Sequence, residues 1–201
     1  GELSKVTRRL TRADIRNLMD VSDKIADLNV ERFKAFSLET LEAEGKQAAL
    51  AFNGDVYQGL QANTLSAEDL TWAQDRLRIL SGLYGVLRPL DAIHPYRLEM
   101  GISLPTKRGG SLYEFWGKKL ADTLNTDIAD HESKVIVNLA SNEYATAVQR
   151  KALKVPLVTI GFHELKDGKA RTLGFFAKRA RGMMARFAIA NRIDTPEGLK
   201  D

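Results

Sequence analysis

The sequence contains no cysteine, and this absence excludes several kinds of chemistry. Without thiols the chain cannot form disulfides, bind a metal through thiolates or use a cysteine nucleophile. It also has no apolar run of roughly 18 residues, the length that a membrane-spanning helix needs. The N-terminal stretch GELSKVTRRLTRADIRN is charged from its start and has no apolar signal-peptide region. We therefore expect a cytoplasmic protein with no membrane partner.

Acidic residues are missing from one segment near the C-terminal end. Between Arg171 and Arg192 there is no Asp or Glu. The same 22 positions hold six basic residues, namely Arg171, Lys178, Arg179, Arg181, Arg186 and Arg192. Removing these six from the 30 basic residues leaves 24 against 26 acidic residues, so the net charge of +4 comes from this segment alone. Such a concentration of positive charge indicates a local anionic partner.

Histidines are few and isolated. His94, His131 and His163 have no second histidine or carboxylate at a helical ligand spacing, so we expect no metal and no cofactor. A site assembled through space from Glu99, Glu143 and His94 is the remaining alternative.

The hydrophobic pattern predicts a single domain over residues 1–201, of α+β or mixed α/β class, with a central mixed sheet flanked by helices. Predicted helices cover residues 12–36 (as two helices or one broken helix), 66–80, 111–125 and 175–191. Predicted strands cover 134–140 and 155–162, a hairpin covers 164–175 with Asp167 and Gly168 at its turn, and glycines and prolines over 83–110 indicate short strands and turns. Residues 46–52 fit either a strand or the end of a helix.

The helix over 175–191 separates apolar from basic residues. Its apolar stripe contains Phe176, Ala180, Met183, Met184 and Phe187. The opposite side contains Lys178, Arg179, Arg181, Arg186 and Arg192. We expect the stripe to be buried and the guanidinium groups, whose planar donors match phosphate oxygens, to face outward. A core helix with a solvated basic face and a membrane-surface helix are the alternatives.

A second basic region follows the helix that Ser66 is expected to cap. Gly82 and Gly85 can expose backbone N–H groups to a phosphate, and Arg76, Arg88 and Arg97 can add charge. The alternative is a helix that ends at Gly82 and is followed by an ordinary turn.

Five ordered blocks carry a family resemblance: FNGDVYQGL, LSGLYGVLRPLDAIHPYRLEMG, LYEFWGKKL, NLASNEY and FFAKRARGMMARF. Together they resemble the YaaA family of bacterial peroxide-stress proteins, from about residue 17 to residue 199. The resemblance implies a mixed α/β protein with a positively charged cleft and a helix-hairpin-helix-like element, which would map onto the helix over 66–80 and a hairpin over 81–86. It also implies DNA binding and a role in limiting iron-driven oxidative damage. An N-terminal family segment with a Ser-Pro-Ala-Lys block, and the C-terminal end, are expected to be missing from residues 1–201.

An enzyme acting on a small anionic or nucleotide-like substrate is the alternative function. In that interpretation Glu99, Glu143 or Asp55 acts as an acid or base, and Arg97 or Lys178 binds an anion. The structural interpretation of the same residues has Glu99 paired with an arginine, and Asn53 and Ser141 capping helices.

Our leading hypothesis is DNA binding, of duplex or distorted DNA, through the phosphate backbone and with low sequence specificity. The helix over 175–191 and residues 76–97 would then line one basic cleft, and no obligate protein partner is predicted. Since thiol peroxidases need a reactive thiolate, we expect protection to act through DNA or iron.

Overall fold

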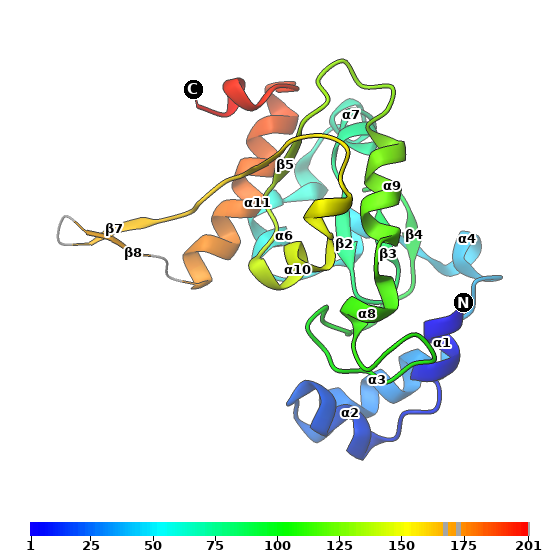
Figure 1. The fold of residues 1–201 in the computed structure, drawn as a ribbon. Coiled ribbons are helices and arrows are strands. Elements are labelled where there is room, and N and C mark those ends of the chain that lie inside the picture. Colours follow the sequence, from blue (N-terminus) through cyan, green and yellow to red (C-terminus); the bar gives the residue numbers. More distant parts are fainter. Residues whose placement is uncertain (167–168, 172–173, 201) are drawn as a thin grey trace.

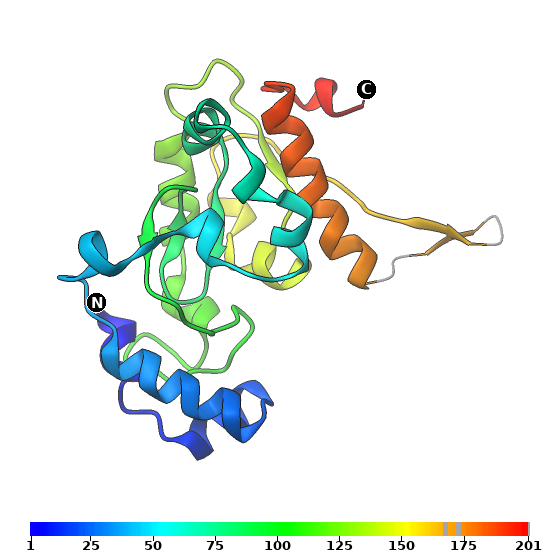
Figure 2. The same ribbon diagram turned by 180° about the vertical axis from the view of Figure 1, so that it is seen from behind.

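The computed structural model describes residues 1–166, 169–171 and 174–200. Figures 1 and 2 show a mixed body of short helices and strands, with the N-terminal helices gathered at one end and a long helix, α11, along one side. Among the described residues no helix is long and apolar enough to cross a membrane.

The N-terminal end consists of α1 (Glu2–Thr7), α2 (Arg12–Met19) and α3 (Asp23–Ala35). The predicted helical stretch over 12–36 is therefore two helices, and α1 is an additional one. Thr11 caps α2, because its side chain accepts a hydrogen bond from the Asp14 amide. These helices bury Ile15 and Phe33 completely, or nearly so, against the rest of the molecule.

A series of short elements follows: α4 (Leu41–Glu44), β1 (Lys46–Gln47), α5 (Ala48–Ala51), α6 (Asp55–Leu60), the 3-10 turn η1 (Ala62–Thr64) and α7 (Ala67–Arg76). Residues 46–52 thus contain both a short strand and a helical turn. Ser66 caps α7 in a reciprocal arrangement with Asp69, as its sequence predicts. Gly54, rather than Asn53, holds the N-cap position of α6.

The helix predicted to reach Leu80 ends four residues earlier, at Arg76. Leu77 has an extended backbone, and the chain enters β2 (Ile79–Ser81), which pairs with β3 (Gly85–Leu87) as an antiparallel hairpin. The apolar spacing of Leu77 and Leu80 fits a helix, but burial of Ile79 opposite Leu87 in the hairpin overrides that spacing.

This β-hairpin replaces the predicted helix-hairpin-helix-like element. Gly82 and Gly85 are both buried inside the protein. A Cβ at Gly82 would lie 2.4 Å from the Leu98 carbonyl oxygen, and one at Gly85, whose φ is +87°, would lie 2.8 Å from the Trp116 ring. The glycines therefore allow close internal packing and a left-handed turn, and their peptide groups are not presented to solvent.

The strand β4 (Ala92–Ile93) pairs with β1 and is followed by turns and then by α8 (Leu112–Trp116) and α9 (Lys119–Asp127). The helix predicted over 111–125 is therefore broken in two, at Gly117, whose φ is +50°. Next come β5 (Ile136–Asn138), α10 (Asn142–Ala147), the 3-10 turn η2 (Arg150–Ala152) and β6 (Leu157–Thr159). The two predicted strands pair with each other in parallel, and Ser141 occupies the N-cap position of α10.

The predicted hairpin is present as β7 (Glu164–Lys166) paired with β8 (Lys169–Arg171), and it projects from the body in both views (Figures 1 and 2). Its predicted turn, Asp167 and Gly168, lies outside the described residues. The chain ends with α11 (Gly174–Ala190) and η3 (Pro196–Lys200), so the predicted basic helix is confirmed.

The fold class is mixed α/β, as predicted, but the described strands form four separate pairs rather than one central sheet. Two apolar clusters hold these elements together. One centres on α3, α8 and α9, and the other on α5, α7 and α11. Tyr84 and Tyr96 pack against both clusters and connect them.

Candidate nucleic-acid interface

The basic helix α11 is held against α6 by a very close backbone contact. A Cβ at Gly182 would lie 1.8 Å from the Val56 carbonyl oxygen, and one at Gly59 would lie 2.2 Å from the Arg179 carbonyl oxygen. Only glycine allows the two helices to approach this closely. The two glycines therefore fix which side of α11 faces the protein.

That orientation differs from the one predicted from periodicity. The buried positions of α11 are the small residues Ala177, Gly182 and Ala185, together with Ile189. The large apolar residues expected in the core are exposed instead: Phe176 by 55%, Met183 by 57% and Phe187 by 38%. The stripe exists as predicted, but the close contact with α6 turns it toward solvent, because a bulky face could not pack there.

The cations of α11 divide into two groups. Lys178 and Arg179 are exposed, whereas Arg181 and Arg186 are half-buried. Arg181 donates hydrogen bonds of 2.7 Å to the carbonyl oxygens of Leu139 and Ala140, just before α10. None of these four cations has a carboxylate partner among the ion pairs of the described residues.

Arg186 and Arg181 each donate hydrogen bonds to backbone carbonyl oxygens of another segment. Arg186 donates to the carbonyl oxygens of Leu60 and Gln61, where α6 ends, at 3.2 and 3.0 Å. Burial lowers the pKa of the Arg181 guanidinium from its usual value, although arginine stays charged at neutral pH. Carbonyl partners satisfy donors without neutralising charge, so both residues keep their positive charge in the structure.

Beside the C-terminal end of α11, two arginines contact one tryptophan of α7. The guanidinium carbon of Arg76 lies 4.5 Å from the ring centroid of Trp72, and that of Arg192 lies 5.7 Å from it. Arg76 is exposed, while Arg192 forms an ion pair with Asp69 at 2.7 Å. Arg76 therefore lies on an element that packs against α11.

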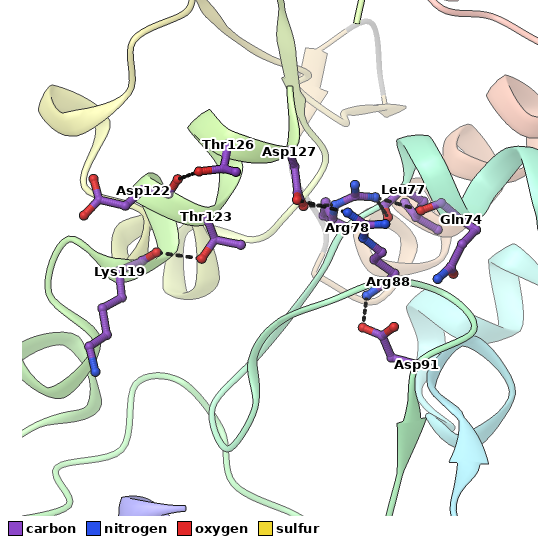
Figure 3. Close-up of polar contacts among 10 residues, drawn as sticks. All are labelled: Gln74, Leu77, Arg78, Arg88, Asp91, Lys119, Asp122, Thr123, Thr126 and Asp127. Atoms are coloured by element: carbon purple, nitrogen blue, oxygen red, sulfur yellow. Dashed lines mark hydrogen bonds and ion pairs between the residues drawn. The ribbon is translucent and has the colours of Figure 1, made fainter. Parts of the chain in front are cut away.

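The remaining arginines of the 76–97 segment form ion pairs with carboxylates. Arg88 pairs with Asp127 of α9 at 3.2 Å, and Asp127 also binds Arg78, whose side chain is only 11% exposed (Figure 3). Burial raises the pKa of Asp127, but the hydrogen bonds and charges of Arg78 and Arg88 outweigh it and leave that pKa below its ordinary value. Arg88 is therefore a member of an internal ion-pair cluster.

Arg97 lies in a different environment, with its amide hydrogen-bonded to Asn29 of α3. Its side chain pairs with Glu99 at 2.9 Å, which confirms the arginine partner expected for this glutamate. The Nε atom of Arg97 is buried without a hydrogen-bond partner. A buried donor of this kind is unusual in folded proteins.

Glu143 and Tyr144 lie close to this pair. Glu143 accepts a hydrogen bond of 2.9 Å from the Gly101 amide. Burial, and after it the charges of Glu143 and Glu99, raise the pKa of Tyr144 to about 12. Glu99, paired with Arg97, and Glu143 thus both lie near Tyr144.

The His94 side chain makes hydrogen bonds within the N-terminal half of the protein. The His94 ring contacts the Thr40 hydroxyl and the Ser37 carbonyl oxygen, both at 3.0 Å. Within the part of the chain that the structure describes, no group of three or more histidine or acidic side chains is placed to hold a metal ion.

Sequence reasoning missed Trp72, Arg78 and Asp127. These residues form no motif in the sequence, and the fold brings Arg78 to Asp127 of α9 and Arg76 to Trp72 of α7. The contact with α6 that orients α11 was not predicted either. Its signal in the sequence was one glycine in each helix, Gly59 and Gly182, because glycine allows two helices to pack closely.

Comparison with known proteins places this architecture in a family. The profile described as peroxide stress protein YaaA matches residues 1–201. A UPF0246 protein of Caulobacter sp. (strain K31) is 61% identical over 200 residues, which cover 100% of this chain and 78% of the relative. UPF0246 protein PHZ_c0561 of Phenylobacterium zucineum (strain HLK1) is 58% identical over 200 residues, with 74% of the relative covered. The chain belongs to the YaaA family of peroxide stress proteins.

Proposed function

We propose that the protein binds the phosphate backbone of DNA with the surface formed by α11 and the neighbouring end of α7. The observation that carries this proposal is the contrast in neutralisation: Lys178, Arg179 and Arg76 are exposed without a carboxylate partner among the described ion pairs. Unpaired cations on neighbouring elements repel one another, and a polyanion relieves that repulsion. The contacts would be to phosphates, so we expect low sequence specificity.

Arg181 and Arg186 support this interface in a different way. Their guanidinium groups are held by carbonyl oxygens and keep their charge, so they add positive potential behind the exposed cations. We expect Arg88 and Arg97 to contribute less than the unpaired cations, because each already pairs with a carboxylate, Asp127 or Glu99.

The test is a salt titration of affinity for a labelled duplex, a bubble and a single-stranded oligonucleotide. With three cations at phosphates, log affinity should fall against log salt with a slope of about −2.7, and with all five at phosphates it should approach about −4.5. A complex insensitive to salt, or equal and negligible retention of all three oligonucleotides, would contradict the proposal.

In the setting of peroxide stress, we propose that this binding limits iron-dependent damage to DNA. The test is nicking of a supercoiled plasmid by ferrous iron and hydrogen peroxide, with the wild-type protein and with the Lys178→Glu, Arg179→Glu double variant. The wild type should slow nicking, and the variant should not. Equal protection by both proteins would show that protection does not depend on DNA binding through α11.

A second candidate function rests on the Arg97, Glu99 and Glu143 cluster. The unpartnered Nε of Arg97 favours a site for a polar ligand, in which Arg97 would bind an anionic group of the substrate and Glu143 would act as acid or base. Glu143→Gln distinguishes the functions, because it should leave DNA retention intact and abolish only an activity of this cluster. Loss of DNA retention in Glu143→Gln would contradict the separation of the two sites.

A further inference from the structure

The outer side of α11 carries a concentration of exposed large apolar side chains. Of the seven such side chains among the residues whose burial is described, four lie in this one helix: Phe175, Phe176, Met183 and Phe187. Single exposed apolar residues are ordinary, whereas several on one element mark a surface that another molecule covers. The backbone of DNA is charged and polar, so the DNA binding proposed above leaves these side chains unexplained.

The exposed stripe has the spacing of a helix that packs against another helix. Steps of four, three and four residues join its members, Phe176, Ala180, Met183 and Phe187. This alternation is that of the a and d positions in a heptad repeat, and the small side chain of Ala180 between two large ones leaves space for a side chain of a facing helix. The contact of Gly182 with α6 holds the opposite side of α11, so the stripe stays directed outward.

The charges beside the stripe indicate which kind of helix fits. Arg179 and Arg186 lie one heptad apart along one margin, whereas the equivalent residues of the other margin, Ala177 and Met184, are uncharged. Two antiparallel copies of α11 would place arginine against arginine, and two parallel copies would place arginine against an uncharged residue. Only a helix with acidic residues beside its own apolar stripe neutralises this margin, so charge complementarity favours a different protein over a second copy.

A flat membrane surface fits the same face less well. In both views the β7–β8 hairpin extends away from the body, past the N-terminal end of α11 (Figures 1 and 2). A bilayer that covered the whole stripe would meet this hairpin first, whereas a single helix, about 10–12 Å across, can lie beside it.

We propose that the outer face of α11 docks an acidic amphipathic helix of a partner protein. The apolar residues of that helix pack between Phe176, Met183 and Phe187, and its carboxylates face Arg179 and Arg186. The inference does not rest on DNA binding. Because Arg179 belongs to both surfaces, a bound helix and DNA should compete for the protein.

Two designed peptides, each about three heptads long, test the charge requirement. Both carry leucine at the a and d positions; one has glutamate at the e and g positions and the other has lysine there, and these like charges keep each peptide from pairing with itself. In fluorescence anisotropy at low salt, the acidic peptide should bind the 201-residue chain about 30-fold more tightly than the basic one.

A double variant tests the apolar stripe. Phe176→Ala with Met183→Ala should weaken binding of the acidic peptide about 50-fold. It should leave DNA affinity unchanged, because neither side chain is charged. Leu38→Ala is the matched control, since Leu38 is an equally exposed apolar residue outside α11, and it should change neither affinity.

Three results would overturn the proposal. Equal binding of the two peptides, or no binding of either, would remove the acidic helix as the occupant. Sedimentation of the protein with anionic phospholipid vesicles, lost in the double variant, would assign the stripe to a membrane. Dimerisation that the double variant abolishes would assign it to a second copy. Peptide binding without DNA binding would support this inference and contradict only the DNA interface.

Discussion

The two basic regions of this protein, α11 and the 76–97 segment, look alike in sequence and differ in the structure. Arg88 and Arg97 each lie within hydrogen-bonding distance of a carboxylate, whereas Lys178, Arg179, Arg181 and Arg186 have exposed surroundings or carbonyl partners. A carboxylate cancels the charge of its partner, while a carbonyl only orients it. Counting basic residues therefore overestimates the 76–97 segment as an anion site, whereas these four cations of α11 have no carboxylate partner among the described ion pairs.

The largest expected effect comes from breaking the contact that orients α11. Gly182→Ala introduces a Cβ 1.8 Å from the Val56 carbonyl oxygen and should lower the free energy of unfolding by about 3 kcal/mol, measured by urea denaturation. Gly174→Ala is the matched control in the same helix, because a Cβ there meets nothing within 4 Å. Equal effects of the two substitutions would show that the α6 contact does not hold α11.

Reversing the charges of Lys178 and Arg179 should remove most of the difference in DNA binding between α11 and the 76–97 segment. Lys178→Glu with Arg179→Glu should weaken binding to duplex DNA by about 100-fold at low salt, since two phosphate contacts are replaced by repulsion. The change is measured by fluorescence anisotropy. Circular dichroism should be unaltered, because both side chains are exposed. Unchanged affinity would remove α11 from the interface.

Breaking the ion pairs of Asp127 with Arg78 and Arg88 should affect stability instead of DNA binding. Asp127→Asn leaves the buried Arg78 guanidinium without its counter-ion and should cost about 3 kcal/mol at neutral pH, against less than about 1 kcal/mol for Asp23→Asn in the exposed pair with Arg16. Chemical denaturation of both variants measures the difference. Similar costs for the two would contradict a structural role for Asp127.

The stability difference between the wild type and Asp127→Asn should depend on pH. The folded-state pKa of Asp127 is lowered, so its stabilisation is fully present above the unfolded-state pKa, near 3.9, and is lost as pH falls through the folded value. The stability difference between wild type and Asp127→Asn should therefore shrink below a pH of about 4. A constant difference down to lower pH would argue against a lowered pKa.

The smallest effect provides the sharpest comparison, because two variants change net charge equally. Arg179→Gln should reduce DNA affinity about 5-fold, whereas Arg97→Gln should change it by less than about twofold, since Glu99 already neutralises Arg97. Both are measured in the same salt. Equal losses would mean that total charge, rather than local neutralisation, governs binding.

Local sequence signals predicted the elements well where a short-range interaction fixes them. The cap at Ser66 and the basic helix α11 are present, because capping and helical periodicity act within a few residues. The predicted end of α7 at Leu80 was wrong, because Ile79 pairs with Leu87 in a β-hairpin and this pairing overrides the helical spacing. For the candidate site, the Arg97–Glu99 pair was predictable, being two residues apart.

The sequence by itself determined that α11 is a helix, that it is amphipathic and that it carries no acidic residue. Only the tertiary structure decided which face of that helix is buried, because Gly182 and Gly59 bring two backbones into contact and leave no space for Phe176 or Phe187 between them. It likewise decided which arginines keep their charge, since ion pairs such as Arg88–Asp127 join residues far apart in the chain. Periodicity reports on neighbours within a helix, whereas burial and neutralisation depend on what the fold places beside it.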